Sequence, residues 1–239
     1  IRKNLTKILA STSQNNSSPK FRMGLSGAGV LSWINPDADA AVAEGDGTRF
    51  NIQYGLHLDF RLGSNENYYF STGLFLLNTG GSLVHQTFTP SLEEGEFDPA
   101  TITIDHRINY LNIPLTMMLR TKEIGYMTYF ARVGADAGFN ISSSYDVSTS
   151  VGGQTTTEED VNDDLAGLFR AALHIEAGLE YNISGNTRLF ASLEWNDGLN
   201  NVFTDDYKVQ SSEPTSGSDG LRTIKGNTDA FLLNVGIYF

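Results

Sequence analysis

The chain has 239 residues, a formal net charge of -12 and no cysteine, and 40% of its residues are hydrophobic. The lack of cysteine excludes a disulfide-stapled scaffold and a thiolate metal site, and an acidic chain without a basic stripe is not expected to bind nucleic acid. No run of about 20 apolar residues occurs, which excludes a transmembrane helix, but a β-barrel is compatible because its strands alternate apolar and polar side chains.

The first 20 residues, "IRKNLTKILASTSQNNSSPK", carry basic residues and then a polar stretch of Ser and Asn. Such a composition predicts a segment that is loose alone and becomes ordered only on a partner, with plain disorder as the alternative. We therefore expect residues 1–20 to be an N-terminal extension and residues 21–239 to form one domain.

Residues 49–62 have the clearest pattern in the chain, since apolar and polar side chains alternate strictly and so lie on opposite faces of one long strand. The apolar face has Phe50, Ile52, Tyr54, Leu56, Leu58, Phe60 and Leu62, and the other has Arg49, Asn51, Gln53, Gly55, His57, Asp59 and Arg61. Less perfect alternation recurs at about residues 21–34, 67–82, 102–120, 126–141, 168–183, 187–197 and 228–239. The chain therefore has eight predicted strands. Pro114 removes one backbone donor, so we expect a bulge or an unpaired position there.

The connections alternate in length. Residues 63–67, 121–125 and 184–187 are short and rich in Gly, Asn and Ser, whereas residues 35–47, 83–101, 142–167 and 198–227 are long and hold most of the acidic residues. The acids are interpreted as solvated loop tips, with binding of a hard divalent cation as the alternative. Short turns at one end and long loops at the other are typical of outer-membrane barrels. The predicted fold is an all-β, single eight-stranded antiparallel up-and-down transmembrane β-barrel with short periplasmic turns and long extracellular loops. Its expected location is the bacterial outer membrane, in contact with lipid and lipopolysaccharide, with residues 1–20 in the periplasm.

The side chains expected to face inward carry both signs of charge. A barrel of eight strands has room only for side chains or one small ligand, and charges removed from water must be paired. We therefore expect a salt-bridged polar network that closes the lumen, with no metal and no cofactor. Its expected members are Arg49, His57, Asp59, Arg61, Arg132, Asp136, His174, Glu176, Glu180 and Glu194, and Arg22, Arg120 and Arg170 are also expected inside. An alternative is that His174, Glu176 and Glu180 form an acid/base cluster or a metal site.

Two stretches add a resemblance to a known family. Residues 109–120, "NYLNIPLTMMLR", followed by "YFARVGADAGFNIS", resemble the PorT-like outer-membrane barrels of Bacteroidota, which implies a link to type IX protein secretion. The end of the chain, "FLLNVGIYF", resembles the assembly signal of outer-membrane barrels. The residues that carry this signal are Phe231, Leu233, Val235, Ile237 and Phe239.

These observations favour a non-enzymatic barrel that acts as a structural or assembly subunit of a larger, secretion-related envelope complex, with protein partners. One alternative is an outer-membrane enzyme, a lipid acyltransferase or a protease, with its site at the loop rim. Another is a soluble lipocalin-like carrier, whose strands would point their apolar face inward.

Overall fold

The structure, a computed structural model, describes residues 19–37, 43–90, 97–162, 165–204, 207–210 and 221–239. Residues 1–18 of the expected N-terminal extension lie outside these ranges, as do the acidic loop residues Asp39, Glu93, Glu94, Glu96, Asp163, Asp164, Asp205, Asp206, Glu213 and Asp219. Within the described ranges, no helix is long and apolar enough to cross a membrane.

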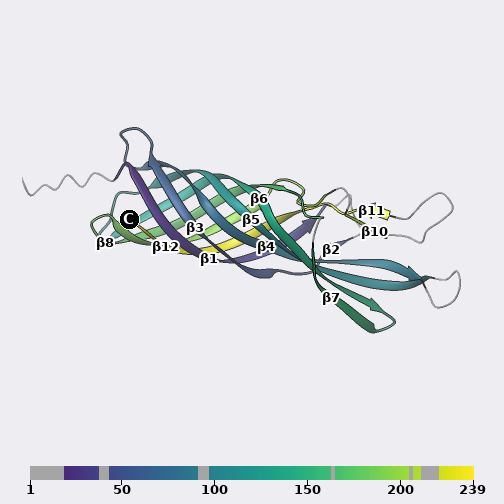
Figure 1. Ribbon diagram of the computed structural model, residues 1–239. Helices are drawn as coiled ribbons and strands as arrows, with labels where there is room; N and C mark the ends of the chain where they lie inside the picture. Colours follow the sequence, from purple (N-terminus) through teal and green to yellow (C-terminus); the bar gives the residue numbers. More distant parts are fainter. Residues whose placement is uncertain (1–18, 38–42, 91–96, 163–164, 205–206, 211–220) are drawn as a thin grey trace, which may run out of the picture.

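The chain is built from β-strands (Figure 1). They are β1 (Phe21–Pro36), β2 (Glu44–Gly45), β3 (Arg49–Arg61), β4 (Tyr68–Pro90), β5 (Phe97–Arg120), β6 (Met127–Val151), β7 (Gln154–Asn162), β8 (Phe169–Ser184), β9 (Thr187–Gly198), β10 (Lys208–Gln210), β11 (Leu221–Thr223) and β12 (Gly226–Tyr238).

Eight of these strands close into a ring in the order β1, β3, β4, β5, β6, β8, β9 and β12, and every neighbouring pair is antiparallel. The ring closes where β12 pairs with β1, from Gly24 opposite Tyr238 to Pro36 opposite Gly226. Closure gives each of these strands a partner on both edges, which a strand in hydrocarbon requires because lipid cannot replace a missing hydrogen bond. The prediction of an eight-stranded up-and-down barrel is confirmed.

The outer face of the ring is apolar, whereas the inner face combines buried charged and polar side chains with two apolar clusters. On β3, Phe50, Ile52 and Phe60 are exposed, whereas His57 and Asp59 are buried. A soluble carrier would show the reverse arrangement, with its apolar face turned inward.

Exposed aromatic side chains gather in two bands on the outer face. One band lies near the short turns and includes Phe21, Phe60, Tyr68, Tyr126, Tyr129 and Tyr181, and the other lies near the long connections and includes Phe50, Phe139, Phe169, Trp195 and Phe231. On β6, Tyr129 and Phe139 mark the two bands, and the stretch between them matches the roughly 9–11 residues with which a tilted strand crosses a bilayer. Aromatic girdles at this spacing are typical of strands that span lipid.

We call the two ends of the barrel the turn end and the loop end. At the turn end the strands are joined by the short connections that the sequence predicts, after β3, β5 and β8. At the loop end the predicted strand ends at residues 82, 102 and 141 are wrong. Strand β4 continues to Pro90, β5 already begins at Phe97, and β6 continues to Val151.

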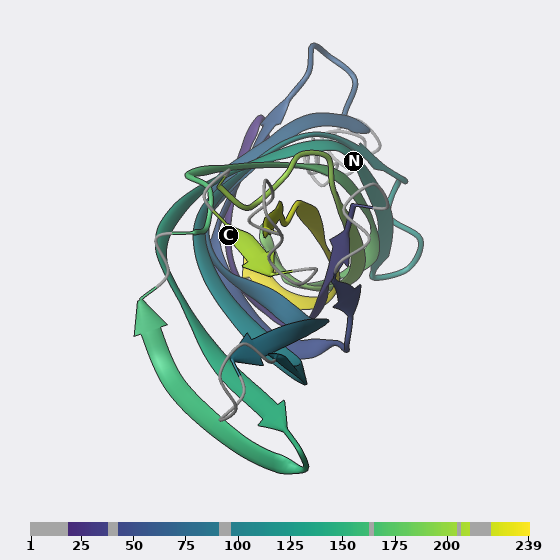
Figure 2. The ribbon, with the colours of Figure 1, turned by 90° about the vertical axis from the view of Figure 1, so that its right-hand side faces the viewer.

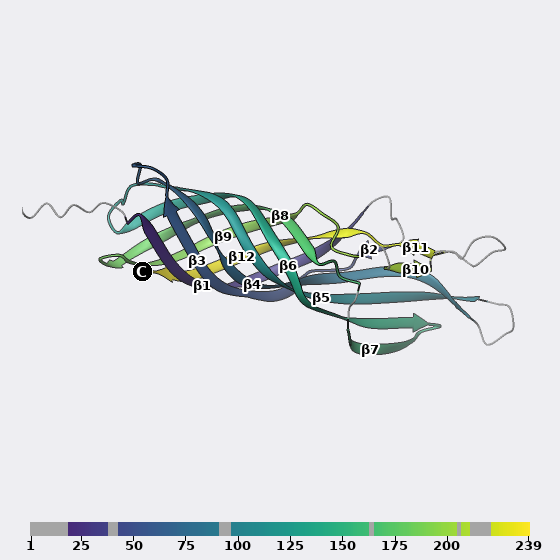
Figure 3. The same cartoon turned by 45° about the horizontal axis from the view of Figure 1, so that its top comes forward.

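The continued strands form a sheet that stands beyond the barrel (Figures 1 and 3). Residues 82–90, 97–107, 143–151 and 154–162 make up this loop-end sheet, in the order β4, β5, β6, β7. The short strand β2 pairs with the other edge of β4, at Leu83 and Val84. The last hairpin turns at Gly152 and Gly153, whose positive φ angles of 57° and 83° suit the tight turn between β6 and β7. Seen along the barrel, this hairpin projects to one side of the ring (Figure 2).

The loop-end sheet has an apolar inner face that covers the mouth of the barrel. Leu83 and Ile104 from this sheet, together with Ile108 just beyond it on β5, form one buried cluster with residues of the long connections, namely Val202, Phe203, Tyr207, Ile224 and Ala43. The connections are therefore held over the barrel mouth by ordinary hydrophobic packing.

Pro114 lies at an interruption of the ladder between β4 and β5. The pairing runs from Tyr68 opposite Leu119 to Ser71 opposite Thr116, and resumes only at Phe75 opposite Asn112. Pro114 is thus in a position without a partner on that side, as its missing N–H requires. The register shift between β5 and β6 occurs elsewhere, at Asn109 and Tyr110, so the bulge is not at the proline.

Candidate functional site

The lumen is lined by charged side chains from alternate positions of the strands. The structure buries eight of the ten residues expected in the polar network, namely His57, Asp59, Arg132, Asp136, His174, Glu176, Glu180 and Glu194, and it also buries Arg22, Arg120 and Arg170. The other two lie at the ends of β3. Arg49 begins the strand and is partly exposed, whereas Arg61 ends it and pairs with Glu66 in the following turn, with 3.4 Å between Arg61 Nη1 and Glu66 Oε1.

Glu180 is the centre of the charge cluster nearest the turn end. Its Oε1 accepts a hydrogen bond from Arg22 Nη2 and its Oε2 accepts one from Arg120 Nη2, both at 2.6 Å. Arg22 also lies 3.7 Å from Asp59, and the Arg22 guanidinium stacks 4.0 Å from the centre of the Tyr238 ring. Two arginines from β1 and β5 thereby hold one carboxylate of β8 across the lumen.

The next cluster is built on Arg132 and Glu176, which stand opposite each other on β6 and β8. Arg132 Nη1 donates to Glu176 Oε2 at 2.5 Å and Arg132 Nη2 donates to the Tyr238 hydroxyl at 2.5 Å. Ser192 donates its hydroxyl to Glu176 Oε1. Because each side chain has several partners, this part of the lumen is fixed in one arrangement.

Nearer the loop end, His174 lies among three carboxylates. Its Nδ1 is 3.1 Å from Asp136 Oδ1 and 3.3 Å from Glu194 Oε1, and its Nε2 is 3.4 Å from Glu176 Oε2. The alternative acid/base cluster expected from the sequence has His174, Glu176 and Glu180. The structure brings His174 and Glu176 together, whereas Glu180 is bound by two arginines in the cluster nearest the turn end.

Amide side chains that the charge-based reading left out complete the upper network. Asn112 and Asn196 donate to Asp136 Oδ2 at 3.0 and 2.6 Å, and Asn234 donates to Glu194 Oε2 at 3.0 Å. All three lie at inward positions of their strands, so the alternation in the sequence indicates them, although the charge pattern does not.

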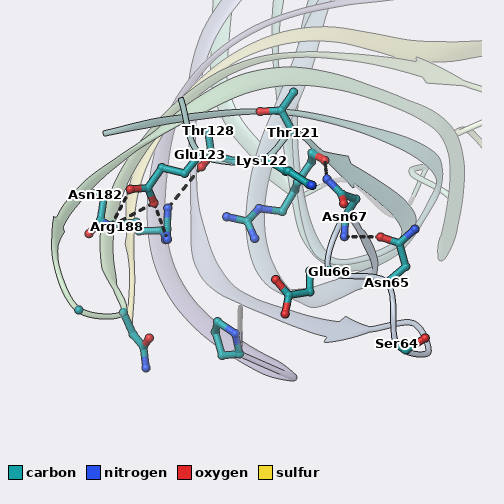
Figure 4. A pocket seen from close by; sticks show the side chains of 14 residues that line it. Ser64, Asn65, Glu66, Asn67, Thr121, Lys122, Glu123, Thr128, Asn182 and Arg188 are labelled. Carbon is teal, nitrogen blue, oxygen red and sulfur yellow. Dashed lines mark hydrogen bonds and ion pairs between the residues drawn. The ribbon is translucent and has the colours of Figure 1, made fainter. Parts of the chain in front are cut away.

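These contacts fill the lumen. The cavity among the central side chains is about 20 Å³, which is room for a single water molecule. A larger hollow of about 560 Å³ opens at the turn end, where Arg188 and Asn182 contact Glu123 at 3.0 and 3.1 Å, and Asn67 donates to the carbonyl oxygen of Arg120 at 2.6 Å (Figure 4). The hollow at this mouth therefore does not continue as a wide passage through the barrel.

The residues expected to carry an assembly signal lie along the outer face of β12, with Phe239 directly after the strand. Phe231, Leu233, Val235 and Phe239 are exposed, and Ile237 is half-buried. The strand they mark is paired with β1 on one edge and with β9 on the other.

A family model described as an outer membrane protein beta-barrel domain matches residues 9–204. No curated protein matches the chain. Among solved structures, Neisserial surface protein A is 10% identical with a TM-score of 0.41, and the alignment covers 92% of this chain and 96% of that protein. The attachment invasion locus protein Ail of Yersinia pestis is 16% identical with a TM-score of 0.36, at 92% and 100% coverage. The outer membrane protease OmpT of Escherichia coli is 10% identical with a TM-score of 0.37, at 92% and 96% coverage.

The family match covers most of the barrel, and the closed ring with its apolar outer face agrees with it. The protein resides in the bacterial outer membrane, where the turn end faces the periplasm and the loop end faces the exterior. Its outer face is therefore in contact with lipid and lipopolysaccharide. The chain belongs to the outer membrane protein β-barrel domain family.

Proposed function

We propose that this barrel is a non-enzymatic structural or assembly subunit of a larger envelope complex. The observation that supports the proposal is the filled lumen, in which buried ion pairs occupy the space that a channel would need. A barrel whose centre is filled in this way would act through its surfaces. The resemblance of residues 109–120 to PorT-like barrels makes protein secretion the first process in which to look for partners.

The loop-end sheet offers the surface best suited to a protein partner. Its outer face carries rows of small polar side chains, in which Ser148 and Ser150 contact Thr157 and Thr155 through their hydroxyls at 3.1 and 2.6 Å. Such a face is held in shape by the sheet and offers many hydrogen-bonding groups.

Strand β7 is the edge of this sheet, and among the described residues it pairs with β6 alone. Val151 and Gln154 flank the two-residue turn and form the first hydrogen-bonded pair of the hairpin. Hydrogen-bonded and non-hydrogen-bonded pairs alternate along an antiparallel ladder, so Thr155 and Thr157 belong to non-hydrogen-bonded pairs. Their backbone N–H groups therefore point away from β6, toward the free edge. An extended segment of a partner could add to the sheet there.

The experiment is co-purification from native membranes in mild detergent, followed by mass spectrometry, with wild type compared with Thr157→Pro. Proline removes an N–H that points away from β6, so the barrel and its own hairpin should remain intact. Thr157→Ala is the matched control because it keeps the N–H.

The expected result is a set of envelope proteins recovered with wild type and Thr157→Ala and reduced with Thr157→Pro. Loss of lipid or peptide turnover in a folded His174→Ala variant would instead favour the alternative that the barrel is an outer-membrane acyltransferase or protease. Recovery of the barrel alone from native membranes, under conditions that preserve other envelope complexes, would contradict the proposal.

A further inference from the structure

We propose that Asp136, His174 and Glu194 form a binding site for one divalent first-row transition metal ion, for which Zn²⁺ is the probe. The three residues stand on the neighbouring strands β6, β8 and β9, and their ligand atoms all lie within 4.8 Å of one another. All three side chains are buried. This site does not depend on the function proposed above, and it revises the expectation that the lumen holds no metal.

The distances within the cluster suit a tetrahedral ion. His174 Nδ1 is 3.1 Å from Asp136 Oδ1 and 3.3 Å from Glu194 Oε1. Nitrogen and oxygen ligands bind Zn²⁺ at about 2.0–2.2 Å, which places two ligand atoms of a tetrahedron roughly 3.3–3.6 Å apart, close to the two distances here. The mixture of one imidazole and two carboxylates is a donor set that zinc accepts.

The remaining oxygens of both carboxylates are already bound by amides. Asp136 Oδ2 accepts hydrogen bonds from Asn112 and Asn196, and Glu194 Oε2 accepts one from Asn234. Asp136 Oδ1 and Glu194 Oε1 are therefore the oxygens turned toward His174. Outer hydrogen bonds of this kind orient the ligands in known metal sites.

The other nitrogen of the histidine also has the partner that a metal ligand needs. His174 Nε2 lies 3.4 Å from Glu176 Oε2, and that oxygen accepts a 2.5 Å hydrogen bond from Arg132. A metal-bound histidine usually donates its second ring N–H to a carboxylate, which fixes the ring and raises its basicity. Glu176 occupies that position here.

Asp136 and Glu194 form no direct ion pair with an arginine in the described part of the chain, although the Arg170 guanidinium attracts both carboxylates electrostatically. Glu180 pairs with two arginines and Glu176 with one, whereas the ion pairs of Asp136 and Glu194 in the described part of the chain both go to His174. Two buried carboxylates that share one imidazole are costly, because a buried charge needs close compensation. A divalent ion would compensate both.

The cavity of about 20 Å³ lies beside the cluster and provides room for a fourth ligand. Its lining includes Gln53 and Asn112, which are 6% and 3% exposed. Gln53 Oε1 and Asn112 Oδ1 are buried acceptors without a hydrogen-bond partner. A water bound to the metal would fill this space and could donate to these oxygens, which accounts for two polar atoms that are otherwise unsatisfied.

The test is to refold the full chain in detergent micelles with Zn²⁺ or with EDTA, because the site is enclosed and an ion enters most readily as the barrel forms. After gel filtration, bound zinc is counted by mass spectrometry, and X-ray absorption identifies the atoms around it. The expected result is about one zinc per barrel with nitrogen and oxygen ligands. Refolding with Co²⁺ should give the visible absorption of a tetrahedral site.

The isosteric variant Asp136→Asn combined with Glu194→Gln should lose the bound zinc. Asp59→Asn, which removes a buried lumen carboxylate outside the cluster, should keep it. Should the double variant fail to fold, ¹⁵N spectra of His174 in the zinc-refolded wild type decide, because a metal-bound ring has one protonated nitrogen and an imidazolium has two. Folded wild type without zinc, two protonated nitrogens, or equal zinc in wild type and the double variant would each overturn the proposal.

Discussion

Arg132 and Glu176 stand directly opposite each other on β6 and β8, and their side chains form an ion pair with 2.5 Å between Nη1 and Oε2. Both side chains are at most 2% exposed. Strand register places the two charges together, and the barrel removes them from water. Loss of one partner therefore leaves a buried charge without compensation.

We predict that Arg132→Met lowers the free energy of unfolding by about 3–5 kcal/mol, because Glu176 stays buried and loses its cation. The double change Arg132→Met with Glu176→Leu should recover most of this loss, since both charges are then absent. Urea unfolding in lipid vesicles, followed by heat-modifiable migration on gels, measures both. The control is Arg61→Met, whose partner Glu66 is 42% exposed, and it should cost no more than about 1 kcal/mol. Equal losses in the single and double variants would contradict the interpretation.

A second prediction concerns the lipid-facing surface. Val133 is 47% exposed on the outer face of β6, between the aromatic bands marked by Tyr129 and Phe139. Val133→Arg should lower the free energy of unfolding in a bilayer by about 2–4 kcal/mol, because the charge is placed near the midplane. Ser148→Arg, on the same strand in the loop-end sheet, faces water and should change stability by less than about 0.5 kcal/mol. Similar costs at the two positions would show that the lipid boundary lies elsewhere.

The barrel could be predicted from the sequence because lipid on one side and a polar lumen on the other impose a strict alternation. The alternation predicts a strand over residues 49–62, and the structure gives β3 as Arg49–Arg61, one residue shorter. The continuation of β6 to Val151 could not be predicted, because beyond the lipid the outer face carries serine and threonine. Apolar residues continue on the other face, where Tyr145 and Val147 pack against the buried cluster, but the alternation changes phase at the register shift opposite Asn109 and Tyr110. The ladder itself continues through Ala100 opposite Val151.

The candidate site, like the barrel, could be predicted from the sequence only in part. Alternation placed His57, His174 and Glu194 inward, but it does not show which side chains meet across the lumen. Glu180 forms ion pairs with two arginines, whereas Asp136 pairs with His174. Strand tilt and register decide these partners, and the sequence of a single strand does not show them. Arg49 fits the alternation, but it begins the strand, where a long side chain can turn toward water.

A third prediction concerns conductance. Planar-bilayer recordings should show no stable, wide open channel, because side chains fill a lumen of this strand number. The cavity among the central side chains, about 20 Å³, holds about one water molecule. A porin recorded in the same membrane serves as the control. A steady, large conductance from purified wild type would contradict the filled lumen and, with it, the main support for the proposed function.

The last prediction concerns the loop-end sheet and pH. His85 lies on the buried face of this sheet, outside the lipid, and is 3% exposed. Burial lowers the pKa of His85 below its ordinary value of 6.5. The neutral ring is therefore favoured while the sheet is closed, whereas an opened sheet returns the ring to its ordinary pKa. The contribution of His85 to stability is present above about pH 6.5 and is lost as the pH falls, because the opened form then binds a proton that the closed form does not.

Limited proteolysis of residues 82–107 should therefore be faster at about pH 5 than at about pH 7.5, with the barrel itself still protected. His85→Gln keeps a polar side chain of similar size but cannot titrate, so its proteolysis should depend much less on pH, and the same pH dependence in this variant would show that another group opens the sheet.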